Sequence, residues 1–101
     1  MKDSPVACQL SDNEFQERRS GLLAKVRDQV QEVKSLDSGY ALRFESTNEI
    51  IDELTRLIQL ERGCCQFLEF NLRVLPEQGP IWLELSGPEG TKEFLDSLLG
   101  N

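Results

Sequence analysis

The sequence predicts an α+β fold in which helices pack on a three-stranded antiparallel sheet. Apolar residues recur at helical spacing in three segments and alternate with polar residues in three others. The resulting element order is α-β-α-β-β-α, and a strand, a crossover helix and a hairpin most simply place the strands in the order 1-3-2. We therefore expect a truncated ferredoxin-like fold, and the length of 101 residues predicts a single domain, residues 1–101.

The first helix is expected from about residue 12 to about residue 34. Ser11 and Glu14 form an S-x-x-E capping box at its start. The apolar residues at helical spacing are Phe15, Leu22, Leu23, Val26, Val30 and Val33. Arg18 and Arg19 flank this apolar stripe, which predicts one buried face along the helix.

The first strand is expected at residues 39–45, after a turn at residues 37–39. Tyr40, Leu42 and Phe44 alternate there with more polar neighbours, which indicates a half-buried strand. The second helix follows a cap at residues 46–49. Its predicted buried face comprises Ile50, Ile51, Leu54, Leu57 and Ile58.

Two further strands are expected near residues 70–75 and 81–86. A last helix should start at residues 87–89, where Pro88 stands at or near the first helical position. The buried face predicted for this helix comprises Phe94, Leu95, Leu98 and Leu99. These elements complete the predicted order of strands and helices.

The last two strands should form a hairpin. A simple register places Val74 opposite Leu83, so that core residues face core residues. The same register places Arg73 opposite Glu84, an opposite-charge pair on the outer face.

The outer face of the predicted sheet carries Ala41, Leu75 and Trp82. These residues are apolar enough to require a cover, which the first helix or a partner protein could supply. A partner at the Trp82 and Leu75 surface, or a homodimer, is therefore one expectation for this face.

Composition excludes several classes of function. The chain has 18 acidic and 11 basic residues and a formal charge of -7, which argues against binding to nucleic acid or to an anionic membrane. No apolar run approaches the roughly 20 residues that span a bilayer, and the start of the chain has no signal-peptide pattern. We therefore expect a cytoplasmic protein whose three cysteines are reduced. The chain has no histidine, which excludes mechanisms that need imidazole.

The candidate site is the end of the second helix. On a wheel of about 100° per residue, Glu61 and Cys65 fall within the apolar stripe, Cys64 lies on its edge and Arg62 lies beside it. We expect Glu61 to be buried and paired with an arginine, because a buried carboxylate needs a partner. Cys65 should be the more buried cysteine, and Cys64 the more exposed and reactive one.

Paired cysteines favour soft metal chemistry. The thiolate is the form that binds metal, and the nearby cation of Arg62 would lower a thiol pKa. Cys64 and Cys65 could together hold a soft metal or a metalloid ion, with Cys8 as a third ligand. The alternative is that the cysteines pack in the core as small apolar residues. The expected cofactor is therefore a soft metal or metalloid ion, or none.

The chain resembles a family of small bacterial proteins marked by an E-R-x-C-C-x-F segment, here residues 61–67, and a W-L-x-L-x-G-P-E-G segment, here residues 82–90. The resemblance covers nearly the whole chain, and Gln66 stands where related sequences tend to have proline. It implies no particular reaction. The site residues that it implies are Cys8, Glu61, Arg62, Cys64 and Cys65.

Three functions remain from the sequence. The first is a thiol protein that binds a soft metal or metalloid ion through its paired cysteines. The second is a small interaction or dimerisation module with structural cysteines. The third is a thiol-redox enzyme, which is the weakest because the chain has neither a C-x-x-C motif nor a histidine base.

Overall fold

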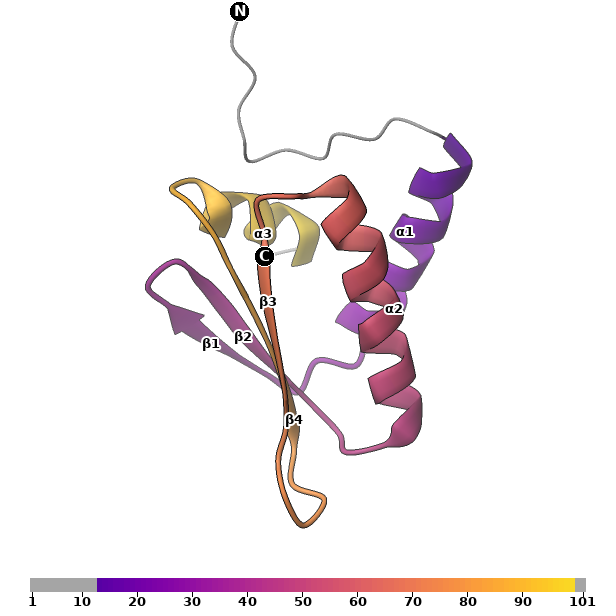
Figure 1. Cartoon of the computed structure of the whole chain (residues 1–101), viewed down its shortest axis with the longest axis vertical. Coiled ribbons are helices and arrows are strands. Elements are labelled where there is room, and N and C mark those ends of the chain that lie inside the picture. The colour runs from indigo at the N-terminus through magenta and orange to yellow at the C-terminus, as the bar shows by residue number, and fades with distance from the viewer. Residues whose placement is uncertain (1–12, 100–101) are drawn as a thin grey trace, which may run out of the picture.

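The computed structural model describes residues 13–99, with the side chains of Asn13 and Phe15 outside the description. One antiparallel sheet has four strands in the order β1-β2-β4-β3, and helices pack on it (Figure 1). The elements in chain order are α1 (Asn13–Arg27), β1 (Glu32–Leu36), β2 (Gly39–Phe44), α2 (Asn48–Cys64), β3 (Glu69–Val74), β4 (Ile81–Ser86) and α3 (Thr91–Leu99).

The predicted three-stranded, truncated ferredoxin-like fold is wrong, because the second half of the expected first helix forms strand β1. Helix α1 ends at Arg27, and residues 37 and 38 form the turn of a hairpin between β1 and β2. In this hairpin Val33 lies opposite Leu42, and the element order becomes α-β-β-α-β-β-α. The physical reason is pairing: β2 would otherwise be an open edge, and its backbone groups find partners in β1.

The hairpin of β3 and β4 also differs from the predicted register. Val74 lies opposite Ile81, whereas Leu83 lies opposite Leu72. This shift by two residues keeps the same side chains on the core face, so apolar alternation could not distinguish the two registers. The connecting loop decides between them, because Glu77 and Gln78 both adopt a left-handed conformation with φ of 57°.

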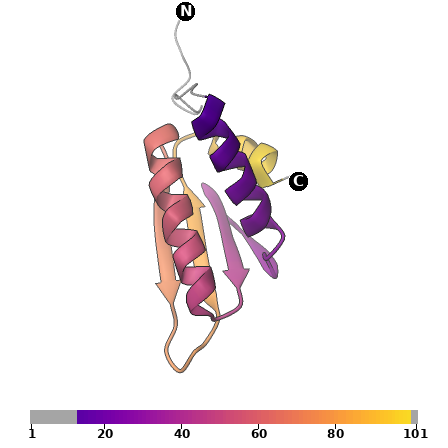
Figure 2. The same ribbon diagram turned by 90° about the vertical axis from the view of Figure 1, so that its right-hand side faces the viewer.

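The core lies between the helices and one face of the sheet. Helices α1 and α2 lie side by side over this face (Figure 2), and α3 packs against β2 and α1. The buried core residues are Val26, Leu42, Phe44, Ile50, Leu54, Leu57, Ile81, Leu83, Leu85 and Leu95. No helix within residues 13–99 is long and apolar enough to cross a membrane.

The opposite face of the sheet is left uncovered by the described helices, because all three pack toward the core face. Its end row is formed by successive cross-strand neighbours, which are Glu32, Arg43, Trp82 and Arg73. From the sequence, the first helix was one expected cover for this face. That expectation is wrong, because α1 packs on the core face. We name these four residues the outer row.

Leu75 lies beyond the end of β3 and lines a shallow pocket with Thr47 and Ile51, so it does not share a surface with Trp82 through the strand register.

Helix α3 begins at Thr91, later than the sequence predicts. The residue before it, Gly90, has φ of 97°, which is a conformation that suits glycine and precedes the helix.

Candidate thiol site at the end of helix α2

Helix α2 continues through Gly63 to the paired cysteines. It begins after Thr47, whose hydroxyl accepts a hydrogen bond from the backbone N–H of Ile50 at 3.1 Å, as expected of an N-cap. At the other end the N–H of Cys65 still donates to the carbonyl of Glu61 at 2.5 Å. Cys65 itself has φ of -119° and ψ of 77°, so the chain leaves helical geometry at this residue. Glycine therefore does not end the helix, and the second cysteine does.

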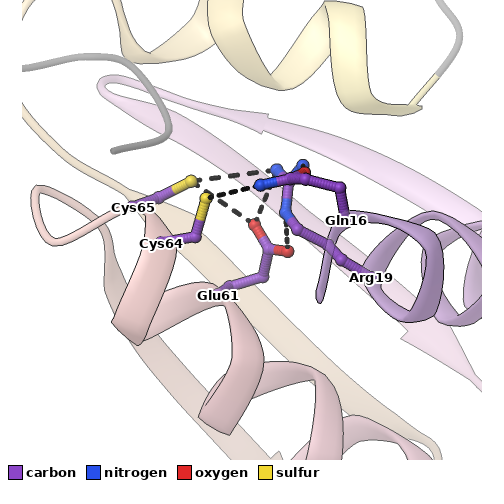
Figure 3. Close-up of polar contacts among 5 residues, drawn as sticks. All are labelled: Gln16, Arg19, Glu61, Cys64 and Cys65. Carbon is purple, nitrogen blue, oxygen red and sulfur yellow. Dashed lines mark hydrogen bonds and ion pairs between the residues drawn. The ribbon is translucent and has the colours of Figure 1, made fainter. Parts of the chain in front are cut away.

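The centre of the site is a buried ion pair between α1 and α2. Arg19 is 7% exposed and Glu61 is 3% exposed. The guanidinium donates from Nε to Oε2 of Glu61 at 2.5 Å and from Nη2 to Oε1 at 3.1 Å (Figure 3). This two-point geometry matches the planar fork of arginine to a carboxylate. The prediction that Glu61 is buried and paired with an arginine is confirmed.

Cys65 makes hydrogen bonds with both members of this pair. Its thiol donates to Oε1 of Glu61 at 3.5 Å and accepts from Nη2 of Arg19 at 3.8 Å. Burial, and after it the charge of Glu61, raise the pKa of this thiol to about 12 against the opposing effect of Arg19. Cys65 is therefore a protonated thiol near neutral pH.

Cys64 is as buried as Cys65, with 0% of each residue exposed. Its sulfur accepts a hydrogen bond from Nε2 of Gln16 at 4.0 Å. Cys64 is disulfide-bonded, and Cys65 is the free cysteine of the described residues, so the expectation that the cysteines are all reduced does not hold for Cys64. The prediction that Cys64 is the more exposed cysteine is wrong. Adjacent residues diverge by about 100° only while both are helical. Because Cys65 is not helical, both sulfur atoms lie toward α1 (Figure 3).

The cation beside the thiols is Arg19 and not Arg62. Arg62 is exposed, whereas the guanidinium of Arg19 contacts both Cys65 and Glu61 and is further held by Oε1 of Gln16 at 3.4 Å. The sequence contained a signal for this role, since Arg19 stands three and seven residues before the apolar Leu22 and Val26. That spacing places it on the buried face of α1.

Within residues 13–99, the side chains of this site that could bind a metal ion are those of its cysteines. Among residues 13–99, no group of three or more histidine, cysteine, aspartate or glutamate side chains is arranged to hold a metal ion. Both carboxylate oxygens of Glu61 already accept hydrogen bonds from Arg19. Cys65 is thus the free soft donor here, and Cys64 becomes a second one only when its disulfide is reduced. Cys8, the third ligand predicted from the sequence, lies outside the described residues.

A small apolar cavity adjoins the ion pair. It measures about 20 Å³ and is lined by Glu61 together with residues of α1, α3 and the sheet. A space of this size holds roughly one water molecule. The apolar residues of its wall include Leu23, Val26, Leu42, Leu57, Leu95 and Leu98. The surroundings of the ion pair are therefore predominantly apolar, which strengthens its electrostatic interactions.

No protein-family model, curated protein or solved structure matches this chain.

Proposed function

We propose that this protein, once the disulfide of Cys64 is reduced, binds a soft metal or metalloid ion through Cys64 and Cys65. The observation that carries the proposal is that both sulfur atoms lie on the same side, toward Gln16 and Arg19 of α1 (Figure 3). Two neighbouring thiols that converge can share one ion, whereas two that diverge cannot. The Arg19–Glu61 pair lies directly against this position.

Burial supports a soft ion over a hard one. Both cysteines are shielded from water, and hard ions such as Mg²⁺ and Ca²⁺ require oxygen ligands that these residues do not supply. Thiolates prefer soft centres such as Hg(II) or arsenic(III). The site therefore favours ions that are satisfied by few sulfur ligands.

Arg19 supports the deprotonated form of the site. An ion must displace the thiol protons, because the thiolate is the ligand. The raised pKa of Cys65 makes this displacement costly at neutral pH, so binding should release protons and strengthen as pH rises. Once a proton has left, the guanidinium at 3.8 Å stabilises the sulfur charge.

Native mass spectrometry of the fully reduced protein tests the proposal. The protein is kept with a thiol-free reductant and is mixed in turn with zinc, cadmium, mercury(II) and arsenite. We expect one mercury or arsenic atom per chain, weaker cadmium binding, and no binding in the Cys64→Ser/Cys65→Ser variant.

The matched control is Cys8→Ser, which keeps the paired cysteines. If it lowers arsenite binding but not mercury binding, Cys8 is the third ligand predicted from the sequence. An ion that stays bound when both paired cysteines are replaced would overturn the proposal.

The thiol-redox function receives less support. A nucleophilic cysteine needs a lowered pKa, and burial beside Glu61 raises that of Cys65.

A second candidate function is a weak homodimer formed by the uncovered sheet face. The outer row runs across the four strands in the order Glu32, Arg43, Trp82 and Arg73. A two-fold axis parallel to the strands, between β2 and β4, places Glu32 opposite the partner's Arg73 and Trp82 opposite the partner's Arg43. Lys34 Nζ already lies 4.8 Å from the Trp82 ring centroid, so this ring accepts a cation.

The size of the face limits the strength of such a dimer. Strand spacing and rise give roughly 400 Å² per copy, about half of a standard interface of ~800 Å² per partner. Sedimentation equilibrium should therefore detect dimers only at high protein concentration, and Arg73→Glu should abolish them. A monomer at every concentration would exclude this candidate.

A further inference from the structure

We infer that the free edge of strand β3 is a homodimer interface at which two copies of this chain pair antiparallel, centred on Asn71. Strand β3 (Glu69–Val74) is the outermost strand of the sheet (Figure 2), so within residues 13–99 one side of its backbone has no neighbouring strand. An unpaired strand edge is a template for pairing with another chain. The inference goes beyond the proposed metal site, and this surface differs from the uncovered sheet face.

The direction of the backbone groups on this edge follows from the ladder between β2 and β4. The N–H of Gly87 donates to the carbonyl of Ser38 at 3.1 Å, and these two residues lie opposite each other in the register of the two strands. Hydrogen-bonded pairs alternate along an antiparallel ladder, so the odd-numbered residues of β4 bond to β2 and the even-numbered ones bond to β3. Their partners in β3 are odd-numbered. The N–H and C=O groups of Phe70 and Leu72 therefore point to the free edge.

This direction limits the registers in which two copies can pair. Residues that point outward must lie opposite residues that point outward, because each such pair exchanges two hydrogen bonds. Pairing Phe70 with the partner's Leu72 meets this condition and centres the dimer on Asn71. The same register places Glu69 directly opposite the partner's Arg73, and Arg73 opposite the partner's Glu69.

Charge complementarity identifies a second copy as the occupant of the edge. Glu69 is exposed, and the side chain of Arg73 is 51% exposed although it lies 3.7 Å from Glu84. Opposite charges that face each other across two strands stabilise the pairing. Two identical edges supply two such pairs, whereas an unrelated strand would have to supply both charges at the same spacing.

The register also covers an exposed apolar side chain. Val74 is 53% exposed, which makes it one of the large exposed hydrophobic residues of the described chain. In the dimer it lies opposite the partner's Leu68, which is half-buried in the single chain. Pairing thus removes apolar surface from water in addition to forming hydrogen bonds.

Strand β3 also lacks the residues that commonly block an open edge. Natural sheets often protect their edges with lysine or proline. The opposite edge, strand β1, has Lys34 at its centre, whereas residues 69–74 contain neither residue type. The sequence of the two edges therefore favours pairing through β3.

Amide hydrogen exchange of the full-length protein, followed by NMR at several protein concentrations, tests the interface. We expect a dissociation constant of about 0.1 mM, because one strand edge is small for an interface. At ~1 mM protein, exchange at Phe70 and Leu72 should then be about fivefold slower than in dilute protein, because it proceeds from the monomer. The control groups are the N–H groups of Val33 and Ser35, which point to the free edge of β1 by the same alternation and should show no such change.

Two charge variants test the register. Glu69→Arg gives both facing pairs two positive charges, and Arg73→Glu gives them two negative charges. Each variant alone should be monomeric by sedimentation equilibrium at ~1 mM. An equimolar mixture should dimerise as the wild type does, because each variant supplies the charge that the other lacks. Recovery in the mixture separates charge pairing from a loss of folding.

The outcomes distinguish this edge from other surfaces. Glu32→Arg, a change in the outer row, should leave dimerisation unchanged. The inference is wrong if the wild type is monomeric at ~1 mM, if Glu69→Arg dimerises as the wild type does, or if the mixture stays monomeric. Slower exchange at Val33 and Ser35 in place of Phe70 and Leu72 would also overturn it, as would loss of the dimer in Glu32→Arg. None of these measurements involves the cysteines, so the proposed metal site stands or fails independently.

Discussion

Two ion pairs join helices α1 and α2, and they differ in their surroundings. Lys25 and Glu53 meet at 3.1 Å near the N-terminal half of α2, where the lysine side chain is 64% exposed. Arg19 and Glu61 meet at 2.5 Å near its C-terminal end, where both side chains are at most 8% exposed. The first pair is partly hydrated, and the second is enclosed by protein.

The same kind of contact therefore has different consequences in water and in the core. The pKa of Glu53 is lowered, mainly by the hydrogen bond from Gln29 and also by Lys25, as expected of an accessible carboxylate with donors. Beside the buried pair, burial and then the charge of Glu61 raise the pKa of the Cys65 thiol to about 12, while Arg19 opposes them. A buried ion pair can therefore influence the pKa of a neighbouring thiol.

The largest expected effect is the loss of stability when the buried pair, in contrast to the hydrated one, loses its carboxylate. Glu61→Ala leaves Arg19 buried and uncompensated, which should cost about 3–5 kcal/mol of unfolding free energy. Glu53→Ala should cost less than about 1 kcal/mol, because Lys25 is hydrated. Urea denaturation followed by circular dichroism measures both. Similar midpoints for the two variants would remove the distinction between the pairs.

The next effect concerns the thiols enclosed with the buried pair. Cys64→Ser places a hydroxyl in a site that is 0% exposed, and the expected cost is about 1–3 kcal/mol. Arg62→Ala, a change at an exposed neighbour, should stay within about 0.5 kcal/mol of the wild type. Denaturation of both reduced variants provides the comparison. A Cys64→Ser protein as stable as Arg62→Ala would show that this cysteine is not enclosed.

The third effect is a dependence of stability on pH. The thiol pKa of Cys65 is raised from 9.0 to about 12 by folding, so the unfolded chain loses this proton first as pH rises. Stability is therefore fully present below about pH 9 and is lost toward pH 12, by up to about 1.4 kcal/mol per pH unit. The measurement is the difference in unfolding free energy between wild type and Cys65→Ala from pH 8 to pH 11. Parallel curves would mean that folding leaves this thiol pKa unchanged.

The smallest effect is the response of the two pairs to salt. A double-mutant cycle for Lys25 and Glu53 should give about 0.2–1 kcal/mol at low salt, and almost nothing in 1 M NaCl. The same cycle for Arg19 and Glu61 should change little with salt, because ions do not reach the pair. Equal salt sensitivity of both coupling energies would contradict the burial of Arg19 and Glu61.

The candidate site could be predicted in part from the sequence. The helical spacing of Glu61 with Leu54 identified its buried position, and the need for a cation identified arginine as the type of partner. The identity of that arginine could not follow, because Arg19 and Glu61 are 42 residues apart and meet only when α1 packs on α2. The relative exposure of the two cysteines was predicted wrongly because a helical wheel does not describe Cys65, which leaves helical geometry after the last turn.

For the fold, local periodicity alone determined which side chains of β2, β4, α2 and α3 face the core, since alternation and helical spacing are properties of short segments. Only the tertiary structure decided that residues 32–36 form a strand, because the three-residue spacing of Val30 and Val33 fits a helix and pairing with β2 overrides it. The hairpin register was decided in the same way, by a loop whose left-handed residues carry no signal in an apolar pattern. The convergence of the two sulfur atoms beside Arg19 also belongs to the tertiary structure, because it depends on where one helix ends against another.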